Sequence, residues 1–249
     1  MDAYHTLANS YDRLTNDVDY ASIVGFYEEI LSREGLHPRT AADLACGTGS
    51  VALLLAQRGL GVTAVDMSEE MLCVASQKAQ DLRNPPIFVC QKLQNLRLPR
   101  GVDLAVSALD SIDYILDPED CRKAFYRIYR CLNPGGCFIF DVNTPEKLMA
   151  MDGQVFLDED DDVYCIWRGE FDCDSNICTY GMDLFQRQGS AWYRSQEIHR
   201  EYAYTQQQLT EYLKEAGFTH IEVFADRKME QPQPGEQRIF IKARKGRIK

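Results

Sequence analysis

The chain has 249 residues, of which 45% are hydrophobic and 26% charged, which is ordinary for a globular protein with a sizeable core. Lys and Arg total 27 against 38 Asp and Glu, and because the formal net charge of −11 opposes binding to phosphate backbones, no nucleic acid partner is expected. The polar N-terminus has no apolar signal core and no apolar run approaches the ~18 residues of a membrane span, which predicts a cytoplasmic protein without a membrane partner.

The first part of the chain predicts helices and a parallel sheet. Residues 1–38 are expected to be a helical N-terminal extension. Short apolar runs then predict strands at 41–45, 61–65, 87–91, 102–107 and 137–142. Helical stretches separate them, with Ser68 a predicted N-cap and Asp117 followed by Pro118 a predicted helix start. Strands that alternate with helices indicate right-handed βαβ units and a parallel sheet.

The pattern changes after the fifth strand. Between 154 and 204 the helical period disappears, and apolar Cys178 and Met182 alternate with polar Thr179 and Asp183. This alternation predicts an antiparallel sheet of three or four strands. A helix at 206–216 and strands at 219–225 and 237–243 complete an α/β fold with seven strands, mostly parallel, and an antiparallel β insert after strand five.

Chemistry is concentrated at the end of the first predicted strand, in the segment Asp43-Leu44-Ala45-Cys46-Gly47-Thr48-Gly49. A strand that runs through a glycine turn into a helix brings backbone N–H groups close to a ligand. Asp66 ends the second strand, where a carboxylate can accept both hydroxyls of a ribose. The two features predict a site for an adenosine-type cofactor at the carboxyl ends of the sheet.

Two cofactors fit that turn. Gly47-Thr48-Gly49-Ser50-Val51-Ala52 also matches the GxGxxA form of the dinucleotide fingerprint, which by itself is weak. Asp43 favours the other choice, because its charge would face the charge of a pyrophosphate but would attract the ammonium and sulfonium of S-adenosylmethionine. A capping role for Asp43 is the structural alternative.

Three segments together resemble the class I S-adenosylmethionine-dependent methyltransferases: DLACGTG at 43–49, VDMSEEML at 65–72 and LNPGGCFIFDV at 132–142. The sequence is most similar to a bacterial group of small-molecule methyltransferases with an N-terminal YD…Y segment, here Tyr11-Asp12 and Tyr20. The resemblance implies a Rossmann-like domain formed by 39–150 and 205–249, a helical lid at 1–38 and an antiparallel β cap at 151–204.

The resemblance also implies where S-adenosylmethionine binds. The implied cofactor residues are Tyr11, Tyr20, Asp43, Ala45, Cys46, Gly47, Gly49, Asp66, Met67, Leu93, Gln94, Ala108 and Leu109. One position departs from the family, which often has an acidic residue after the third strand to accept from the adenine amine. Lys92 stands there and has no acceptor, so Leu93 backbone groups or the Gln94 carbonyl are the expected substitutes.

Two residues are candidates for catalysis, and no metal site is predicted. Asp110 follows the fourth strand, where its carboxylate would accept from a substrate donor or cap the following turn. His199 lies in the insert, and its ordinary pKa range suits a general base, although a lone histidine is more often structural. The five acids at 158–162 have no calcium-loop spacing and are interpreted as a solvated hairpin tip.

These observations predict an S-adenosylmethionine-dependent methyltransferase acting on a small-molecule acceptor. The alternatives are an NAD(P)-dependent oxidoreductase and a regulatory protein that binds S-adenosylmethionine without turnover. The free edge of the insert also allows pairing into a homodimer. The identity of the acceptor and the choice among N-, O- and C-methylation are left open.

Overall fold

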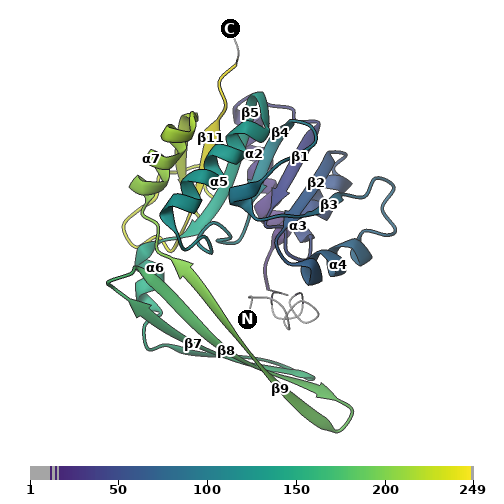
Figure 1. Cartoon of the computed structure of the whole chain (residues 1–249), viewed down its shortest axis with the longest axis vertical. Helices are drawn as coiled ribbons and strands as arrows, with labels where there is room; N and C mark the ends of the chain where they lie inside the picture. The colour runs from purple at the N-terminus through teal and green to yellow at the C-terminus, as the bar shows by residue number, and fades with distance from the viewer. Residues whose placement is uncertain (1–11, 13–14, 16, 248–249) are drawn as a thin grey trace.

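The computed structural model describes residues 12, 15 and 17–247, and it contains two separate β-sheets (Figure 1). The larger sheet has seven strands in the order β10-β11-β5-β4-β1-β2-β3. Their bounds are β1 Thr40–Leu44, β2 Gly61–Asp66, β3 Ile87–Cys90, β4 Val102–Ser107, β5 Leu132–Asn143, β10 Thr219–Ala225 and β11 Arg238–Arg244. All neighbouring pairs are parallel except those of β11, which runs antiparallel to both β5 and β10. The predicted seven-stranded, mostly parallel sheet is confirmed.

Helices cover both faces of this sheet. On one face α5 (Pro118–Cys131) and α7 (Gln206–Ala216) bury aromatic and aliphatic residues against β4, β5 and β11. On the other face lie α2 (Tyr20–Arg33) and α3 (Ser50–Gln57), while α4 (Glu69–Lys78) packs beside β2 and β3. Local chemistry sets the helix ends as predicted, since the Ser68 hydroxyl accepts from the Met71 N–H and α7 ends at Gly217 in a left-handed conformation.

The smaller sheet is the cap, with the order β6-β7-β8-β9. Its antiparallel strands are β6 Val155–Asp160, β7 Val163–Asp172, β8 Ile177–Gln188 and β9 Ala191–Tyr202. Figure 1 shows this sheet extending away from the body, joined to it near α6 (Pro145–Ala150), a short helix that the sequence did not predict. The antiparallel insert after strand five is therefore confirmed, and β6 includes the first three acids of the predicted solvated tip.

The helix α2 differs from the prediction of a lid over 1–38. Its buried side chains, among them Phe26 and Tyr27, pack against Phe224 and Phe240 of the sheet. Such burial makes α2 a fixed layer of the core, so the lid stays a prediction for the residues that precede Tyr20. Within the described part of the chain, no helix is long and apolar enough to cross a membrane.

Candidate functional site

The sheet topology places a crevice at the carboxyl ends of β1 and β4. The chain moves from β1 outward to β2 and β3, then returns to β4 on the other side of β1. In open α/β sheets ligands bind where the strand order reverses in this way. Buried polar residues mark the same edge, namely Asp43, Asp66, Ser107, Asp141 and Asn143.

The glycine turn after β1 has an unusual backbone. Ala45 has a φ of 55°, and Gly47 and Gly49 have φ values of 52° and 79°. A Cβ built on Gly47 would meet nothing within 4 Å, whereas one on Gly49 would lie 3.0 Å from the Cβ of Ala75 in α4. The turn is therefore open at Gly47 and closely packed at Gly49, which are the two conditions for bringing backbone N–H groups close to a ligand. Cys46 directly precedes Gly47, and burial raises the pKa of its thiol well above the usual range.

Asp66 joins this turn to the end of β2. One of its carboxylate oxygens accepts from the Gly47 N–H at 2.8 Å and the other from the Ser68 N–H at 2.9 Å. Each oxygen keeps a further lone pair, so the predicted contact with two ribose hydroxyls is chemically compatible with these bonds. The carboxylate thus fixes the turn and remains an acceptor for a ligand. Met67, the next predicted cofactor residue, is 54% exposed.

Asp43 is buried and only partly satisfied. Its Oδ2 has no hydrogen-bond partner among the described residues, while the Ala52 N–H of α3 faces the carboxyl group. Burial raises the pKa of Asp43 to about 7, the Ala52 N–H lowers it and the nearby Asp66 charge raises it further. The carboxyl group thus has the Ala52 N–H on one side and an unpartnered oxygen on the other, and both the capping role and the cofactor contact stay predictions.

Other polar atoms at this edge also lack protein partners. Within the described residues these are the Ser107 hydroxyl at the end of β4, the Tyr27 hydroxyl on α2 and Oδ1 of Asp113. A buried polar atom without a partner costs free energy unless a ligand or water satisfies it. Together with the Asp43 oxygen, these atoms fit a polar, partly cationic cofactor such as S-adenosylmethionine better than a pyrophosphate.

The turn after β4 has a strained backbone, and the side chain of Asp141 on the neighbouring strand holds it in place. Leu109 and Asp110 have φ values of 55° and 51°, and their N–H groups donate to the two carboxylate oxygens of Asp141 at 3.0 and 3.1 Å. Arg238 bridges Asp141 and Asp110, with 2.5 Å between its Nη2 and Oδ1 of Asp110. Asp110 is thus part of an ion-pair network, and acceptance from a substrate stays a prediction for its other oxygen.

The remaining predicted cofactor residues lie in different surroundings. Ala108 is buried in the core beside the crevice, and Leu93 is buried in the short 3₁₀ turn Leu93–Asn95. The Gln94 side chain lies near α5, where its NH2 group donates to Asp120 at 3.3 Å. This bond does not use the Gln94 carbonyl, so the predicted contact to adenine stays a prediction.

The N-terminal segment reaches the glycine turn. Tyr11 lies outside the described residues, but its neighbour Asp12 accepts from the Thr48 hydroxyl at 2.6 Å and from Lys78 at 2.7 Å. The Tyr20 hydroxyl donates to Thr15 at 3.3 Å, at the start of α2. The N-terminal segment is therefore attached to the same turn that the sequence predicts for the cofactor.

The cap presents titratable side chains to the body. Along the end of β9, buried residues alternate with exposed ones. The buried residues are Glu197, His199 and Glu201, whereas Ile198 is 56% exposed. Burial and the charge of Asp110 raise the pKa of Glu201 to about 8, while its hydrogen bond from Asn143 lowers it. Because a plain stabilising sheet buries apolar side chains, this inverted pattern indicates a functional surface.

His199, the predicted general base, is enclosed in the structure. Its side chain is 1% exposed, with Nδ1 3.4 Å from the Tyr114 hydroxyl oxygen and Nε2 3.2 Å from Oε2 of Glu197. The Trp167 ring lies 5.8 Å from the imidazole, centroid to centroid. Both ring nitrogens thus face protein groups, so His199 is not placed to take a proton directly from a bound acceptor.

Asn143 connects the cap to the body. Its side-chain amide donates to Glu201 at 2.8 Å, its N–H donates to Asp113 at 2.8 Å and its Oδ1 accepts from Lys147 at 2.7 Å. Arg238 also donates to that oxygen. Neither Asn143 nor Arg238 was predicted from the sequence, since the only local signal is a polar residue at the end of an apolar strand.

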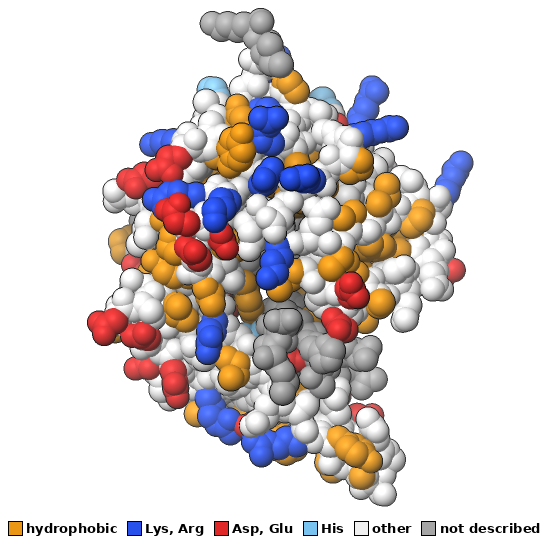
Figure 2. Space-filling view, viewed as in Figure 1, with side chains coloured by type: hydrophobic (Ala, Val, Ile, Leu, Met, Phe, Trp, Pro, Cys, Tyr) orange, Lys and Arg blue, Asp and Glu red, His pale blue; other side chains and the backbone are white. Residues whose placement is uncertain are grey.

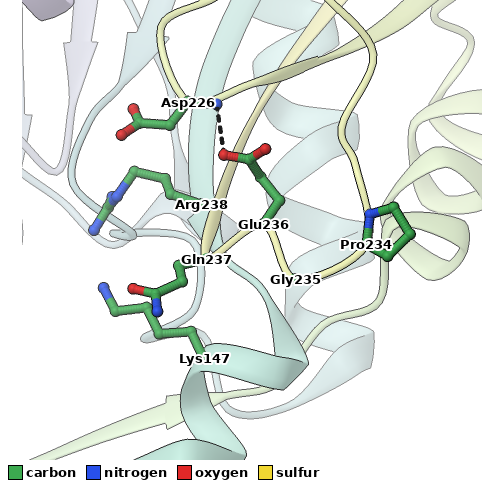
Figure 3. Close-up of a pocket in the computed structure, with 7 residues that line it drawn as sticks. All are labelled: Lys147, Asp226, Pro234, Gly235, Glu236, Gln237 and Arg238. Atoms are coloured by element: carbon green, nitrogen blue, oxygen red, sulfur yellow. Dashed lines mark hydrogen bonds between the residues drawn. The ribbon is translucent and has the colours of Figure 1, made fainter.

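A polar cavity of about 540 Å³ opens beside this network. Lys147 of α6, the loop that ends with Gly235 and Glu236, and Arg238 line it (Figure 3). In Figure 3 the ends of Lys147 and Arg238 lie on the same side of the cavity, and Glu236 accepts from the Asp226 N–H. Arg238, which lines the cavity, also bonds to the turn after β4, so the cavity lies next to that turn.

The fold and this edge define a Rossmann-like enzyme domain with a cap over a cofactor crevice. Residues 41–136 match a family model described as a methyltransferase domain. The chain is 31% identical over 246 residues to a Bacillus subtilis (strain 168) protein named "Putative methyltransferase YqeM", and the match covers 98% of both chains. The chain belongs to the class I S-adenosylmethionine-dependent methyltransferases, and S-adenosylmethionine is its cofactor.

Solved structures agree with this family. An S-adenosylmethionine-dependent methyltransferase from Clostridium acetobutylicum ATCC 824 is similar at a TM-score of 0.88 and 31% identity, over 98% of this chain and all of that one. The sugar N-methyltransferase KedS8 from Streptoalloteichus sp ATCC 53650 has a TM-score of 0.82 at 18% identity, over 100% of this chain and 96% of that one. The second likeness concerns the fold alone, and the nicotinamide alternative is set aside.

Proposed function

We propose that the protein transfers the methyl group of S-adenosylmethionine to a small molecule held between the strand ends and the cap. The observation that carries the proposal is the buried face of β9, where Glu197, His199 and Glu201 replace the apolar residues of a plain sheet. A regulatory protein that only bound the cofactor would have no need for titratable groups on the acceptor side. The cofactor supplies an activated methyl group, and the protein has to align the acceptor and exclude water.

A polar cavity next to the Arg238 network supports a small acceptor as a candidate part of its pocket. The cap joins the body at the end of β5, and the cavity beside it has a volume of about 540 Å³ and a polar lining. Such a volume suits a metabolite-sized ligand rather than a polymer. The sugar N-methyltransferase named above is consistent with a small acceptor, although its similarity to this chain is one of fold.

The test combines binding with turnover. Calorimetry should show that the protein binds S-adenosylhomocysteine and S-adenosylmethionine and does not bind NADH. Release of S-adenosylhomocysteine should then be measured with glycine, ethanolamine, glucosamine, catechol and 4-hydroxybenzoate as acceptors. Binding without turnover on an extended acceptor panel would support the regulatory alternative, and tight NADH binding would contradict the cofactor site.

Glu201 provides a matched pair of variants. Glu201→Gln keeps the shape of the side chain but cannot ionise. Because the pKa of Glu201 is raised to about 8, turnover at pH 9 is expected to fall about tenfold or more if the acceptor depends on the carboxylate charge. Arg200→Gln is the control, because Arg200 is the exposed neighbour on the same strand. Melting temperatures check that both variants fold. Equal turnover in the two variants would remove Glu201 from the acceptor site.

Nucleic acids are not the proposed acceptor. The net charge is −11, and Figure 2 shows acidic as well as basic side chains spread over the visible face. Binding to tRNA or duplex DNA at physiological salt is therefore expected to be weak. Fluorescence anisotropy over a salt series measures this, and sub-micromolar binding with a steep salt dependence would contradict the small-molecule proposal.

A further inference from the structure

Three polar groups from two distant segments lie in a line. The Tyr114 hydroxyl oxygen is 3.4 Å from Nδ1 of His199, and Nε2 of the same ring is 3.2 Å from Oε2 of Glu197. The contact of Nε2 with Glu197 is an ion-pair distance and does not have hydrogen-bond geometry. The nearby carboxylate charge favours the tautomer with its proton on Nε2, which leaves Nδ1 as the acceptor for the phenol. The order phenol, imidazole, carboxylate is the order that a proton relay requires.

The outer end of this line lies at the crevice. Tyr114 follows β4, one of the two strands that flank the reversal of strand order, and its side chain is half-buried. His199 and Glu197 are only 1% and 4% exposed. Tyr114 is therefore the least buried member of the line, and the other two are enclosed behind it.

The segment that carries Tyr114 is fixed on both sides. The carbonyl oxygen of Asp113 accepts from the Tyr202 N–H of β9 at 2.7 Å, and its carboxylate accepts from the Asn143 N–H of β5 at 2.8 Å. Ile112 is fully buried. These bonds hold the phenol and the imidazole in register although the two residues are 85 positions apart.

Aromatic rings surround the imidazole. The Trp167 ring is 5.8 Å away, the Tyr114 ring stands perpendicular to it at 6.1 Å, and Tyr180 is the residue directly opposite on β8. Apolar rings exclude water, so the charge formed on a protonated His199 is balanced by the Glu197 carboxylate rather than by solvent. Packing alone would not need a carboxylate at this buried position.

We propose that Tyr114 faces the methyl acceptor as the first member of a relay to His199, which Glu197 orients. The inference rests on the proposed function and specifies an acceptor whose nucleophilic atom has both a lone pair and a proton to lose, a hydroxyl or a neutral amine. As that atom forms its bond to the methyl carbon, the donor sulfur keeps the electron pair of the broken bond and the acceptor's proton moves to the phenol oxygen. The phenolic proton moves to Nδ1 of His199, and the imidazolium returns it to solvent by the reverse path after product release.

The kinetic test uses Tyr114→Phe, His199→Gln and the double variant in the full-length protein. With the acceptor from the panel above that gives the highest turnover, each single variant should lower kcat about 10²-fold and leave the KM and the S-adenosylhomocysteine affinity unchanged. The double variant should be no slower than either single variant, because both remove the same relay. Tyr193→Phe is the control, since Tyr193 is 57% exposed on the cap.

A second measurement does not depend on turnover. In ¹⁵N-labelled protein the His199 ring signals, assigned with His199→Gln, should show the proton on Nε2 and an accepting Nδ1. Tyr114→Phe should move the Nδ1 signal and Tyr193→Phe should not. The relay would be overturned if the ring carried its proton on Nδ1, or if the Nδ1 signal did not change in Tyr114→Phe.

Failure of the proposed function and failure of the relay give different experimental results. Absence of turnover in the wild-type protein on every acceptor would overturn the proposed function, while the ring signals would still decide whether the phenol-to-imidazole contact exists. Wild-type turnover with full activity in Tyr114→Phe would overturn the relay and leave the proposed function standing. Additive losses in the double variant would likewise reduce Tyr114 and His199 to independent structural roles.

Discussion

Replacing Asp43 by Asn is expected to weaken cofactor binding and to stabilise the free protein. Asp43 is buried, and one of its oxygens has no partner among the described residues. Asn keeps the size of the side chain and an acceptor for the Ala52 N–H, but it has no charge for the ammonium of the cofactor. A charge-assisted hydrogen bond contributes roughly 1.5–3 kcal/mol, so S-adenosylhomocysteine affinity at pH 8 should fall about tenfold or more.

The effect on binding depends on pH. Burial raises the pKa of Asp43 to about 7, so the wild-type carboxyl is ionised at pH 8 and largely protonated at pH 5.5. The difference in affinity between wild type and Asp43→Asn should therefore be large at pH 8 and small at pH 5.5. Calorimetry at both values measures it, and an equal difference at both values would mean that the charge is not what binds the cofactor.

Asp43→Asn is also expected to raise the stability of the cofactor-free protein at high pH. The pKa of this carboxyl is about 7 in the folded protein and 3.8 as the ordinary value, so the folded state holds the proton more tightly. Stability from this group is complete below about pH 4 and is lost as the pH rises to 7, at roughly 1.4 kcal/mol per pKa unit. Without cofactor, Asp43→Asn should therefore melt at a higher temperature than wild type at pH 8 and near the wild-type value at pH 4.

Local sequence signals predicted the cofactor half of the site. The glycine turn, Asp66 at the end of a strand and the alternating insert are each encoded within a few residues, and the structure forms the turn and strands where they were predicted. Asp43 was identified by the same local reasoning. Its buried, unpartnered oxygen follows from packing that the sequence does not display.

The acceptor half depends on partners far apart in the chain. Asn143 and Glu201 are 58 positions apart, and Arg238 reaches Asp110 across 128 positions. His199 was predicted as a base because of its residue type, but its burial behind Tyr114 depends on how the cap folds back on β4. The burial of α2 is a long-range feature as well, because Phe26 packs against Phe224 and Phe240 at the other end of the chain.

Replacing Asp66 by Ala is expected to remove most of the cofactor affinity. The variant loses the predicted ribose contact and also the bonds that hold the glycine turn, and a control variant separates the two effects. The carboxylate holds the Gly47 and Ser68 N–H groups and is predicted to accept the ribose hydroxyls. Each charge-assisted bond contributes roughly 1.5–3 kcal/mol, so S-adenosylhomocysteine affinity should fall at least tenfold, and loss of both backbone bonds should also lower the melting temperature.

Asp103→Ala is the matched control for this prediction. The Asp103 carboxylate also accepts backbone N–H groups, from Arg39 at 2.9 Å and Thr40 at 3.1 Å, but it lies at the start of β4, away from the carboxyl edge. This variant should lose stability and keep its affinity. If Asp103→Ala weakens S-adenosylhomocysteine binding as much as Asp66→Ala does, the loss reflects general destabilisation. If Asp66→Ala binds like wild type, the ribose does not lie at the end of β2.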